Sequence, residues 1–317
     1  MSMINLEIRA ALLANLSDLE PGDHVMVGCS GGADSVALLR AAIHVGRERE
    51  LVVGAIIIDH QLQDGSSTVA SNTSVLAIEL GAEPVVMIPV DVATGAGSGG
   101  LEAAARDARR NAFELYATNN NAKAVLLGHT QDDQAETVLL GLARGSGARS
   151  LSGMRDIDGL YRRPLLSVSR ELVRSTVSDL EVHEDPHNID PRFSRVRVRE
   201  TVLPVLETEL GPGVTAALAR TADMLRDDAD ALDEITQTSI SDDVAVLAKL
   251  PTAIRTRVLR KLAIDSGCNQ NDLSREHVLA IDALITRWHG QGPINLPGNV
   301  DVTRSHGKLM FNKAIKE

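Results

Sequence analysis

The sequence predicts an α/β fold, a doubly wound parallel sheet, joined to a second, mainly helical domain that ends in a small β element. Short β-branched runs alternate with helical patterns from His24 to about Gly128. After about Leu206 only helical patterns continue, until the final residues read as short strands joined by turns at Pro297-Gly298 and His306-Gly307. Buried apolar strands between helices are typical of parallel sheets with right-handed crossovers.

The sheet is expected to contain four strands, each followed by a helix. The expected strands are HVMVG (24–28), LVVGAIIID (51–59), PVVMIPV (84–90) and AVLLG (124–128), and the expected helices cover 34–46, 67–81, 101–120 and 132–143. Polar clusters follow the strands at Ser30, at Asp59, in the glycine-rich segment ATGAGSGG (93–100) and at His129. Ligands of such sheets bind at the carboxyl ends of the strands, so these clusters are expected to converge at one edge. The glycines of 93–100 predict a mobile loop.

Three segments make up the predicted domain organisation. Residues 1–20 are expected to form an amphipathic N-terminal helix. The segment contains the charged residues Glu7 and Arg9 and lacks the basic start and cleavage site of a secretory leader. Residues 21–206 form the sheet domain and residues 207–317 the mainly helical domain. The longest predicted helix of the latter is GVTAALARTADMLRDDADALDEITQ, followed by PTAIRTRVLRKLAIDSG and SREHVLAIDALITRW.

Composition restricts the possible functions. The net charge of −11 argues against a general nucleic-acid binder, but the charge is unevenly distributed. Residues 141–199 contain 11 Arg against 8 Asp and Glu, whereas residues 207–243 contain 2 Arg against 10 Asp and Glu, so a polyanion is expected at the first segment. No apolar run is long enough to span a membrane. The two cysteines, Cys29 and Cys268, indicate neither a disulfide framework nor a metal cluster, and a cytoplasmic location is expected.

The strongest functional signal is the loop Ser30-Gly31-Gly32-Ala33-Asp34-Ser35 after the first predicted strand. Its glycines allow close approach of an anion, its hydroxyls donate hydrogen bonds, and the following helix adds the positive end of its dipole. The alternative is an ordinary strand-to-helix turn with Ser and Asp caps. The lysine-containing loop of phosphoryl-transfer enzymes and the glycine pattern of dinucleotide folds are both missing, which excludes those two classes.

SGGADS after a first strand resembles the PP-loop of ATP pyrophosphatases, whose sheet is HUP-like and Rossmann-like. Longer segments resemble the tRNA(Ile)-lysidine synthetase family in the same order, over roughly residues 25–204. These segments are IIIDHQLQ (56–63), LEAAARDARR (101–110), GHTQDDQAETVLLGLARGSGARSLSGM (128–154), RRPLL (162–166) and EDPHNIDPRFSRVRVRETVLP (184–204). The chain resembles a short form of the family with one added C-terminal domain.

The resemblance implies a two-step ligase that uses ATP and Mg²⁺. ATP would adenylate the C2 oxygen of the wobble cytidine in the tRNA(Ile) with a CAU anticodon, and the amino group of free L-lysine would then displace AMP. The residues implied for ATP binding are Ser30, Gly31, Gly32, Ala33, Asp34, Ser35, Asp59, His60, Gly128 and His129. Asp34 is also the implied ligand of Mg²⁺ and has a catalytic role.

Two predicted helices carry the remaining catalytic candidates. In DDQAETV (132–138), Asp132 shares a helix face with Glu136, and Asp133 with Thr137. Acids beside a nucleotide can hold Mg²⁺ or orient a cationic amine, although acids in a first turn also simply stabilise a helix. Arg106, on LEAAARDARR, is the candidate that stabilises charge on the α-phosphate. A solvated helix with a Glu–Arg pair is the alternative.

Four arginines near the end of the family segment are candidates for tRNA phosphate contacts: Arg192, Arg195, Arg197 and Arg199. A charged surface helix is the alternative. Cys29 and the isolated histidines His24, His44 and His183 are expected to be structural, although a helix N-terminus lowers thiol pKa values and leaves a catalytic Cys29 open.

Two other functions remain open at this point. A tRNA thiolase begins with the same adenylation, but it needs several cysteines to carry sulfur or an iron–sulfur cluster. A non-catalytic nucleotide- or RNA-binding module would keep the loop without the chemistry, which the intact acidic helix and Arg106 argue against. The sequence also leaves open whether the chain forms a homodimer.

Overall fold

The computed structural model describes residues 4–61, 65–91, 100–145 and 147–313. The chain divides into two compact units, Met1–Met224 and Leu225–Glu317. This division falls within helix α10 (Val214–Thr238), later than the predicted change at residues 206–207. Within the described ranges, every helix is too short or too polar to cross a membrane.

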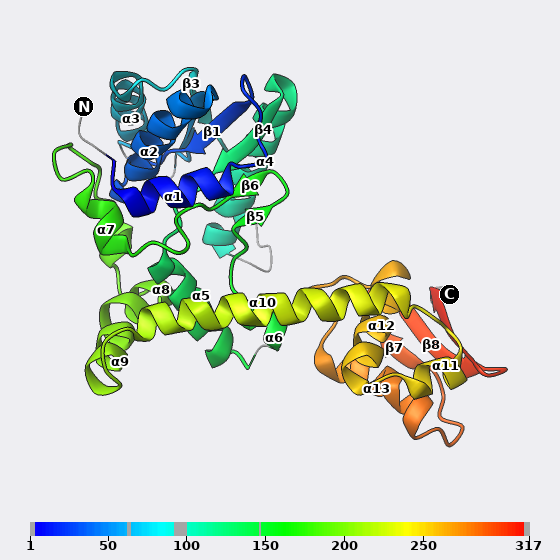
Figure 1. The fold of residues 1–317 in the computed structure, drawn as a ribbon. Helices are drawn as coiled ribbons and strands as arrows, with labels where there is room; N and C mark the ends of the chain where they lie inside the picture. Colours follow the sequence, from blue (N-terminus) through cyan, green and yellow to red (C-terminus); the bar gives the residue numbers. More distant parts are fainter. Residues whose placement is uncertain (1–3, 62–64, 92–99, 146, 314–317) are drawn as a thin grey trace. The chain divides into compact units, whose positions relative to one another are not determined.

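Unit 1 is built on a six-stranded sheet in the order β3-β2-β1-β4-β6-β5 (Figure 1). Its strands are β1 (His24–Gly28), β2 (Val52–Asp59), β3 (Val85–Pro89), β4 (Ala122–Leu126), β5 (Ile157–Asp158) and β6 (Tyr161–Arg162). All neighbours are parallel except β5 and β6. The chain adds β2 and β3 on one side of β1 and β4 on the other, which confirms the predicted doubly wound order and places a switch point between β1 and β4.

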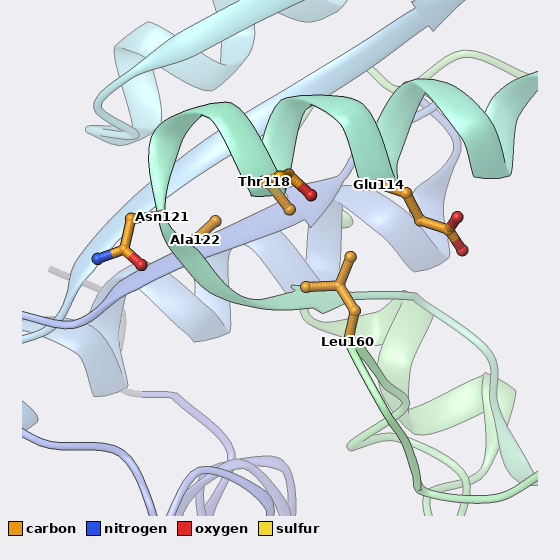
Figure 2. Close-up of a pocket in the computed structure, with 6 residues that line it drawn as sticks. Glu114, Thr118, Asn121, Ala122 and Leu160 are labelled. Atoms are coloured by element: carbon orange, nitrogen blue, oxygen red, sulfur yellow. The ribbon is translucent and has the colours of Figure 1, made fainter.

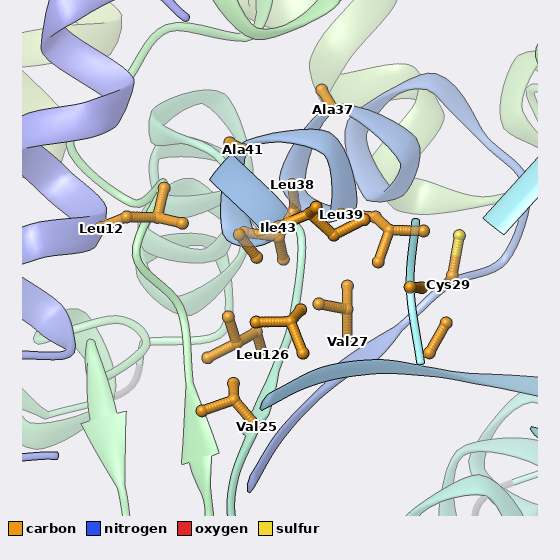
Figure 3. Close-up of a cluster of buried hydrophobic side chains, with 14 of the residues drawn as sticks. Leu12, Val25, Val27, Cys29, Ala37, Leu38, Leu39, Ala41, Ile43 and Leu126 are labelled. Carbon is orange, nitrogen blue, oxygen red and sulfur yellow. The ribbon is translucent and has the colours of Figure 1, made fainter. Parts of the chain in front are cut away.

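Helices cover both faces of this sheet. α1 (Leu6–Asn15), α2 (Ala33–Arg49), α3 (Ser66–Leu80) and α7 (Arg170–Ser175) pack on one side, and α4 (Gly100–Asn120) packs on the other. The remaining helices of unit 1 are α5 (Gln131–Ala143), α6 (Ala148–Leu151), η1 (Pro186–Ile189), α8 (Ser194–Arg197), the π-helical turn η2 (Val198–Val202) and α9 (Leu203–Glu209), and α5 packs with η2 and α9 in a separate cluster. β1 shows why the sheet needs two layers. Val25 and Val27 point into the core with α1 and α2 (Figure 3), whereas Met26 packs with Phe113 of α4 on the other side.

The N-terminal helix belongs to the same core. Leu12 and Leu16 are fully buried against α2 and the sheet. Behind them, the Arg162 guanidinium donates to the Asn15 carbonyl and to both oxygens of Asp18, at 2.6 and 2.8 Å for the carboxylate. This pair lowers the pKa of Asp18 to about 2. The segment predicted as a separate N-terminal helix is therefore tied to β6 by a buried arginine.

Unit 2 combines the C-terminal part of α10 with three helices and a small sheet (Figure 1). These elements are α11 (Val244–Lys249), α12 (Thr252–Asp265), α13 (Arg275–Thr286), β7 (Ile294–Leu296), β8 (Val300–Ser305) and β9 (Lys308–Lys313), with the strands antiparallel in the order β7-β8-β9. His306 and Gly307 both have positive φ, 50° and 78°, as a tight hairpin turn requires. The predicted helical domain with a terminal β element is confirmed.

Candidate active site

The loop between β1 and α2 is organised around the Ser35 hydroxyl. Ser35 Oγ accepts from the Ser30 N–H at 3.1 Å and donates to the Gly32 carbonyl at 2.8 Å. In contrast, the N–H groups of residues 32–34 have no acceptor among the described residues. These donors stand at the N-terminus of a 17-residue helix, where the dipole is positive. The loop therefore offers an anion a set of free backbone N–H groups.

Two glycines fix the loop in place. Gly31 has a φ of +84°, and a Cβ there would clash with Thr73 Oγ1 on α3. Gly128, after β4, packs so closely that a Cβ would lie 3.0 Å from the Asp34 carbonyl oxygen. The Gly31 carbonyl in turn accepts from the His183 N–H at 2.9 Å. Segments from α3, β4 and the region before η1 thus meet at the loop.

Asp34 lies in the first turn of α2 and is paired with two arginines of α7. Arg170 Nη2 lies 3.1 Å from Asp34 Oδ2, and Arg174 Nε lies 3.3 Å from Asp34 Oδ1. The Asp34 side chain is 19% exposed. The carboxylate is therefore neutralised beside the free N–H groups, where it would otherwise repel an anion.

Asp59 and His60 follow β2 and differ in their hydrogen bonding. The buried Asp59 carboxylate accepts from Ser66 Oγ at 2.7 Å, Ser67 Oγ at 2.5 Å and the Gln61 N–H at 3.1 Å. The Ser67 hydrogen bond is the main cause of the lowered pKa of Asp59. His60 Nδ1 is buried with no partner among the described residues, and burial lowers its pKa. The structure therefore makes Asp59 an anchor for the start of α3, whereas His60 keeps an unused polar atom.

His129 follows β4 and is also left with an unused atom. Its Nδ1 is buried without a hydrogen-bond partner in the described chain. Burial lowers the pKa of His129 to about 4, an effect that Asp133 opposes and Arg163 and Arg195 reinforce. His129 is therefore neutral at pH 7 and can act as a hydrogen-bond acceptor or donor without carrying charge.

The three acids of α5 have three different environments. Asp132 Oδ2 accepts from the Arg170 backbone N–H at 2.9 Å. Asp133 Oδ2 accepts from the N–H and hydroxyl of Thr130 at 2.8 and 3.0 Å, which caps the helix. Glu136 is fully buried, and its Oε1 accepts from Arg199 Nε at 2.6 Å.

Glu136 is the unusual member of this group. Its Oε2 is buried and has no donor among the described residues. Burial raises the pKa of Glu136, although the hydrogen bond from Arg199 acts in the opposite direction. A buried carboxylate with one free oxygen and a raised pKa is suited to accept a proton or a cationic donor.

The four arginines predicted for tRNA phosphates do not share one environment. Arg192 and Arg197 are exposed, and Arg192 pairs with Asp190 at 2.6 Å. Arg199, on the π-helical turn, pairs instead with Glu136 and lies 3.5 Å from Asp133 Oδ1. Arg195 is close enough to His129 to lower the pKa of that histidine. A role at tRNA phosphates stays a prediction for Arg192 and Arg197, while the structure places Arg195 and Arg199 beside the predicted catalytic residues.

Arg106 is exposed on α4 and lies near a buried arginine that the sequence reading did not single out. Arg163 is 9% exposed and donates to the Arg155 carbonyl at 2.8 Å. Burial lowers the pKa of Arg163, and the charge of Arg106 lowers it further. The two cations are therefore close enough to repel each other, and an anion bound between them would relieve that repulsion.

The predicted mobile loop, 93–100, lies outside the described residues apart from Gly100.

The residues near the loop suit Mg²⁺ bound together with phosphates. Among the described residues, no group of three or more His, Cys, Asp or Glu could hold a metal ion alone. Mg²⁺ commonly takes only one or two carboxylates and completes its shell with water and substrate phosphates. Asp34 offers such a carboxylate next to the free N–H groups. To bind Mg²⁺, it would have to release one or both of the guanidinium groups of Arg170 and Arg174.

Two features lie apart from this chemistry. A cavity of about 370 Å³, shown in Figure 2, lies beside Asn121 and Ala122 at the amino end of β4, away from the carboxyl ends of the strands. Cys29 is 3% exposed, and burial raises its pKa, which opposes thiolate formation. Cys268 is buried in the core of unit 2. Neither thiol is prepared for sulfur transfer.

Sequence reading missed the residues that contact the loop from α3 and α7, which are Thr73, Arg170 and Arg174, and it gave no role to the buried Arg163. His183, expected to be structural, contacts the loop through its backbone N–H. Arg170 and Arg174 carry a weak signal, since basic residues four apart follow the helix-capping Ser169. Thr73 and the His183 backbone carry none, because their roles depend on tertiary packing.

Comparisons with known proteins agree with this geometry. Residues 5–206 match the PP-loop domain family, and residues 243–310 match the TilS substrate binding domain. A Thermobifida fusca protein named tRNA(Ile)-lysidine synthase is 49% identical over 315 residues, covering 96% of each chain. A Streptomyces coelicolor protein of the same name is 47% identical over 302 residues, covering 91% of this chain and 85% of the relative.

A solved structure with a similar fold is the U34-tRNA thiolase NcsA from Methanococcus maripaludis with its [4Fe-4S] cluster. It has a TM-score of 0.57 and 17% identity, and the match covers 69% of this chain and 78% of that one. At this identity the likeness shows the fold alone. The loop, the order of the sheet and the two family matches together show that the chain belongs to the tRNA(Ile)-lysidine synthase family.

Proposed function

We propose that the chain joins free L-lysine to C2 of the wobble cytidine of tRNA(Ile) with a CAU anticodon, using ATP and releasing pyrophosphate and AMP. The observation that carries the proposal is Glu136, a buried carboxylate with one oxygen paired to Arg199 and the other without a donor in the described chain. It lies on the helix that follows β4, and the anion-binding loop follows the neighbouring strand β1. The site thus combines a position for ATP with an acceptor for an amine.

The first step is adenylation of the tRNA. The cytidine C2 oxygen attacks the α-phosphorus of ATP, an oxygen–phosphorus bond forms, and the bond to the leaving pyrophosphate breaks. The N–H groups of residues 32–34 bind the β- and γ-phosphates, and Arg106 and Arg163 stabilise charge at the α-phosphate. Mg²⁺, held by Asp34 and the phosphates, would neutralise charge on the pyrophosphate.

The second step is attack by lysine. Its amino nitrogen forms a bond to C2, the C2–oxygen bond breaks, and AMP leaves with the electron pair. A protonated amine cannot attack, so the site must remove a proton. Glu136 suits this role because burial raises its pKa towards the working pH. Asp132 accepts a hydrogen bond from the backbone of Arg170 in α7, and Asp133 accepts one from Thr130 at the start of its own helix. Both acids therefore position the helix that carries Glu136.

The tRNA partner follows from the family, and its contacts are part of the proposal. Arg192 and Arg197 are exposed and lie close in sequence to Arg199, which pairs with Glu136. Phosphate contacts there would give binding that weakens as salt rises. A homodimer stays a prediction, as does a cytoplasmic location.

The direct test is incubation of the protein with ATP, Mg²⁺, radiolabelled lysine and a tRNA(Ile) transcript. We expect label on the tRNA only when ATP is present, and none on a transcript whose wobble cytidine is replaced by uridine. Asp34→Ala should abolish tRNA-dependent pyrophosphate release. Absence of label with folded wild-type protein would refute the proposed reaction, and wild-type release rates from Asp34→Ala would refute the assigned loop.

A further inference from the structure

The guanidinium of Arg170 has an unusual set of contacts. Its Nη2 lies 3.1 Å from Asp34 Oδ2, but its Nε and Nη1 are buried and have no acceptor among the described residues. The side chain is 14% exposed. Buried charged donors without acceptors are costly, so such a group in a native site points to a missing anionic partner.

The position of Arg170 is set by the fold. Its backbone N–H donates to Asp132 Oδ2 at 2.9 Å, and Ser169 Oγ caps the helix by accepting from the Leu172 N–H. Val173, on the same helix, is fully buried in the core shared with α2. The arginine is therefore held beside the first turn of α2, next to the free N–H groups of residues 32–34.

We propose that Arg170 binds the β- and γ-phosphates of ATP and stabilises the pyrophosphate as it leaves. Its unused Nε and Nη1 donors lie in the rigid guanidinium plane and point in different directions, so each can donate to a separate phosphate oxygen while Nη2 contacts Asp34. When the α-phosphorus–oxygen bond breaks, the electron pair passes to the pyrophosphate oxygen, and a fixed cation there lowers the barrier. Asp34 would exchange Arg170 for Mg²⁺ in the same event. The inference rests on the loop's proposed role as the ATP site.

Arg174 provides a matched comparison on the same helix. It also contacts Asp34, through Nε at 3.3 Å, but its side chain is 46% exposed. Solvent satisfies its other donors, so it has less to gain from a phosphate. Loss of Arg174 removes a similar charge from Asp34, which separates the effect on Asp34 from direct binding of the phosphates.

The test measures binding of pyrophosphate, ATP and AMP, each with Mg²⁺, to the full chain by calorimetry. For Arg170→Ala we expect pyrophosphate and ATP to bind about 100-fold more weakly, and AMP, which lacks the β- and γ-phosphates, to change less than about twofold. Arg170→Lys keeps the charge but loses the fixed, planar donors, so an intermediate loss of about tenfold is expected. Arg174→Ala should weaken pyrophosphate by no more than about fivefold.

Equal weakening of AMP and pyrophosphate by Arg170→Ala would show that Arg170 only supports the loop, and unchanged pyrophosphate binding would overturn the inference outright. Arg170→Lys gives the same comparison if the alanine variant does not fold. The inference and the proposed function fail separately. Wild-type protein that binds pyrophosphate through Arg170 but attaches no lysine would refute the function alone.

Discussion

Two arginine–carboxylate pairs, one in each unit, have the same contact distance but differ in whether their other polar atoms have partners. Arg255 Nε in unit 2 lies 2.6 Å from Asp282 Oδ1, and Arg199 Nε in unit 1 lies 2.6 Å from Glu136 Oε1. In unit 2 the remaining groups are used: Arg255 Nη1 donates to the Leu250 carbonyl, and Thr286 donates to Asp282 Oδ2 at 3.3 Å. In unit 1 the second oxygen of Glu136 has no donor in the described chain.

The difference separates structural charge from functional charge. A buried ion pair stabilises a fold only when its other donors and acceptors are satisfied, because desolvation otherwise exceeds the attraction. The Arg255–Asp282 pair meets that condition. The Arg199–Glu136 pair does not, and the same site also contains His60 and His129 with unused ring nitrogens and Arg170 with two unused donors. Among the described residues of unit 1, most of the buried side-chain atoms without a partner belong to this site, whereas Asn15 Oδ1 and Arg162 Nε lie at the anchor of α1. The group at the site marks where substrates complete the hydrogen bonding.

The largest expected effect is on Glu136. Glu136→Gln should lower kcat/KM for lysine attachment by about 1000-fold, because the amide cannot take a proton from the amine. Folding stability should stay equal or rise. Burial raises the pKa of Glu136, so above its unfolded pKa the ionised form costs free energy in the folded chain, and the amide removes that cost. A single-turnover assay and thermal unfolding test both parts; a large loss of stability with normal kinetics would reverse the comparison.

The second prediction is the opposite result at Asp282. Asp282→Ala should lower the free energy of unfolding by about 3 kcal/mol, because it leaves Arg255 buried without its carboxylate. The activity of the folded fraction should not change. Asp265→Ala is the control in the same unit, since its pair with Lys261 is exposed and should contribute less than about 1 kcal/mol. Denaturant unfolding measures the free energy of unfolding of both variants. Equal losses for the two would contradict the distinction between the buried and the exposed pair.

The third prediction concerns pH and His129. Its folded pKa of about 4 lies below the ordinary value of 6.5, so between these values the unfolded chain binds more protons and stability falls as pH drops. This term is worth about 2 kcal/mol between pH 7 and pH 5. His129→Gln should lose less stability over that range, whereas the exposed His289→Gln should follow the wild type. Parallel curves for all three proteins would show that His129 is not buried as described.

The smallest expected effect compares two glycines of unit 1 with similar backbone. Gly22 has a φ of +86°, and a Cβ added there would meet nothing within 4 Å, so Gly22→Ala should cost only the backbone term, about 1 kcal/mol. Gly31→Ala adds a clash with Thr73 Oγ1 and should cost about 1 kcal/mol more, with weaker ATP binding. Adding Thr73→Ala should recover the extra cost, and the double variant tests whether the contact is the cause.

Much of the fold could be predicted because its signals are local. The four strands β1 to β4 of unit 1 and the helices after them were predicted with small shifts at their ends, since apolar runs and helical periods specify them. The pair β5 and β6 was missed because two-residue strands carry no alternation. The buried anchor of the N-terminal helix was missed too, since an arginine that pairs across more than a hundred positions leaves no local pattern.

The site shows the same limit. The loop and the acids of α5 were found because each lies in one short segment. The cap that Asp133 forms with Thr130 is local, and stabilisation of the helix was the alternative already predicted for the first-turn acids. The sequence could not show that Glu136 pairs with Arg199, since that contact depends on how η2 packs against α5. Arg170 was missed for the same reason, because its contact with Asp34 joins residues far apart in the chain.

Gly128 has a consequence for how substrates affect each other. Because only a hydrogen atom separates it from the first turn of α2, the end of β4 and the phosphate-binding loop cannot shift independently. Any displacement of the loop on nucleotide binding would therefore be passed to His129, the next residue, and to the start of α5. Substitutions that tighten nucleotide binding by moving the loop would therefore also move the residues proposed to bind the amino acid, so the two specificities could not be changed independently.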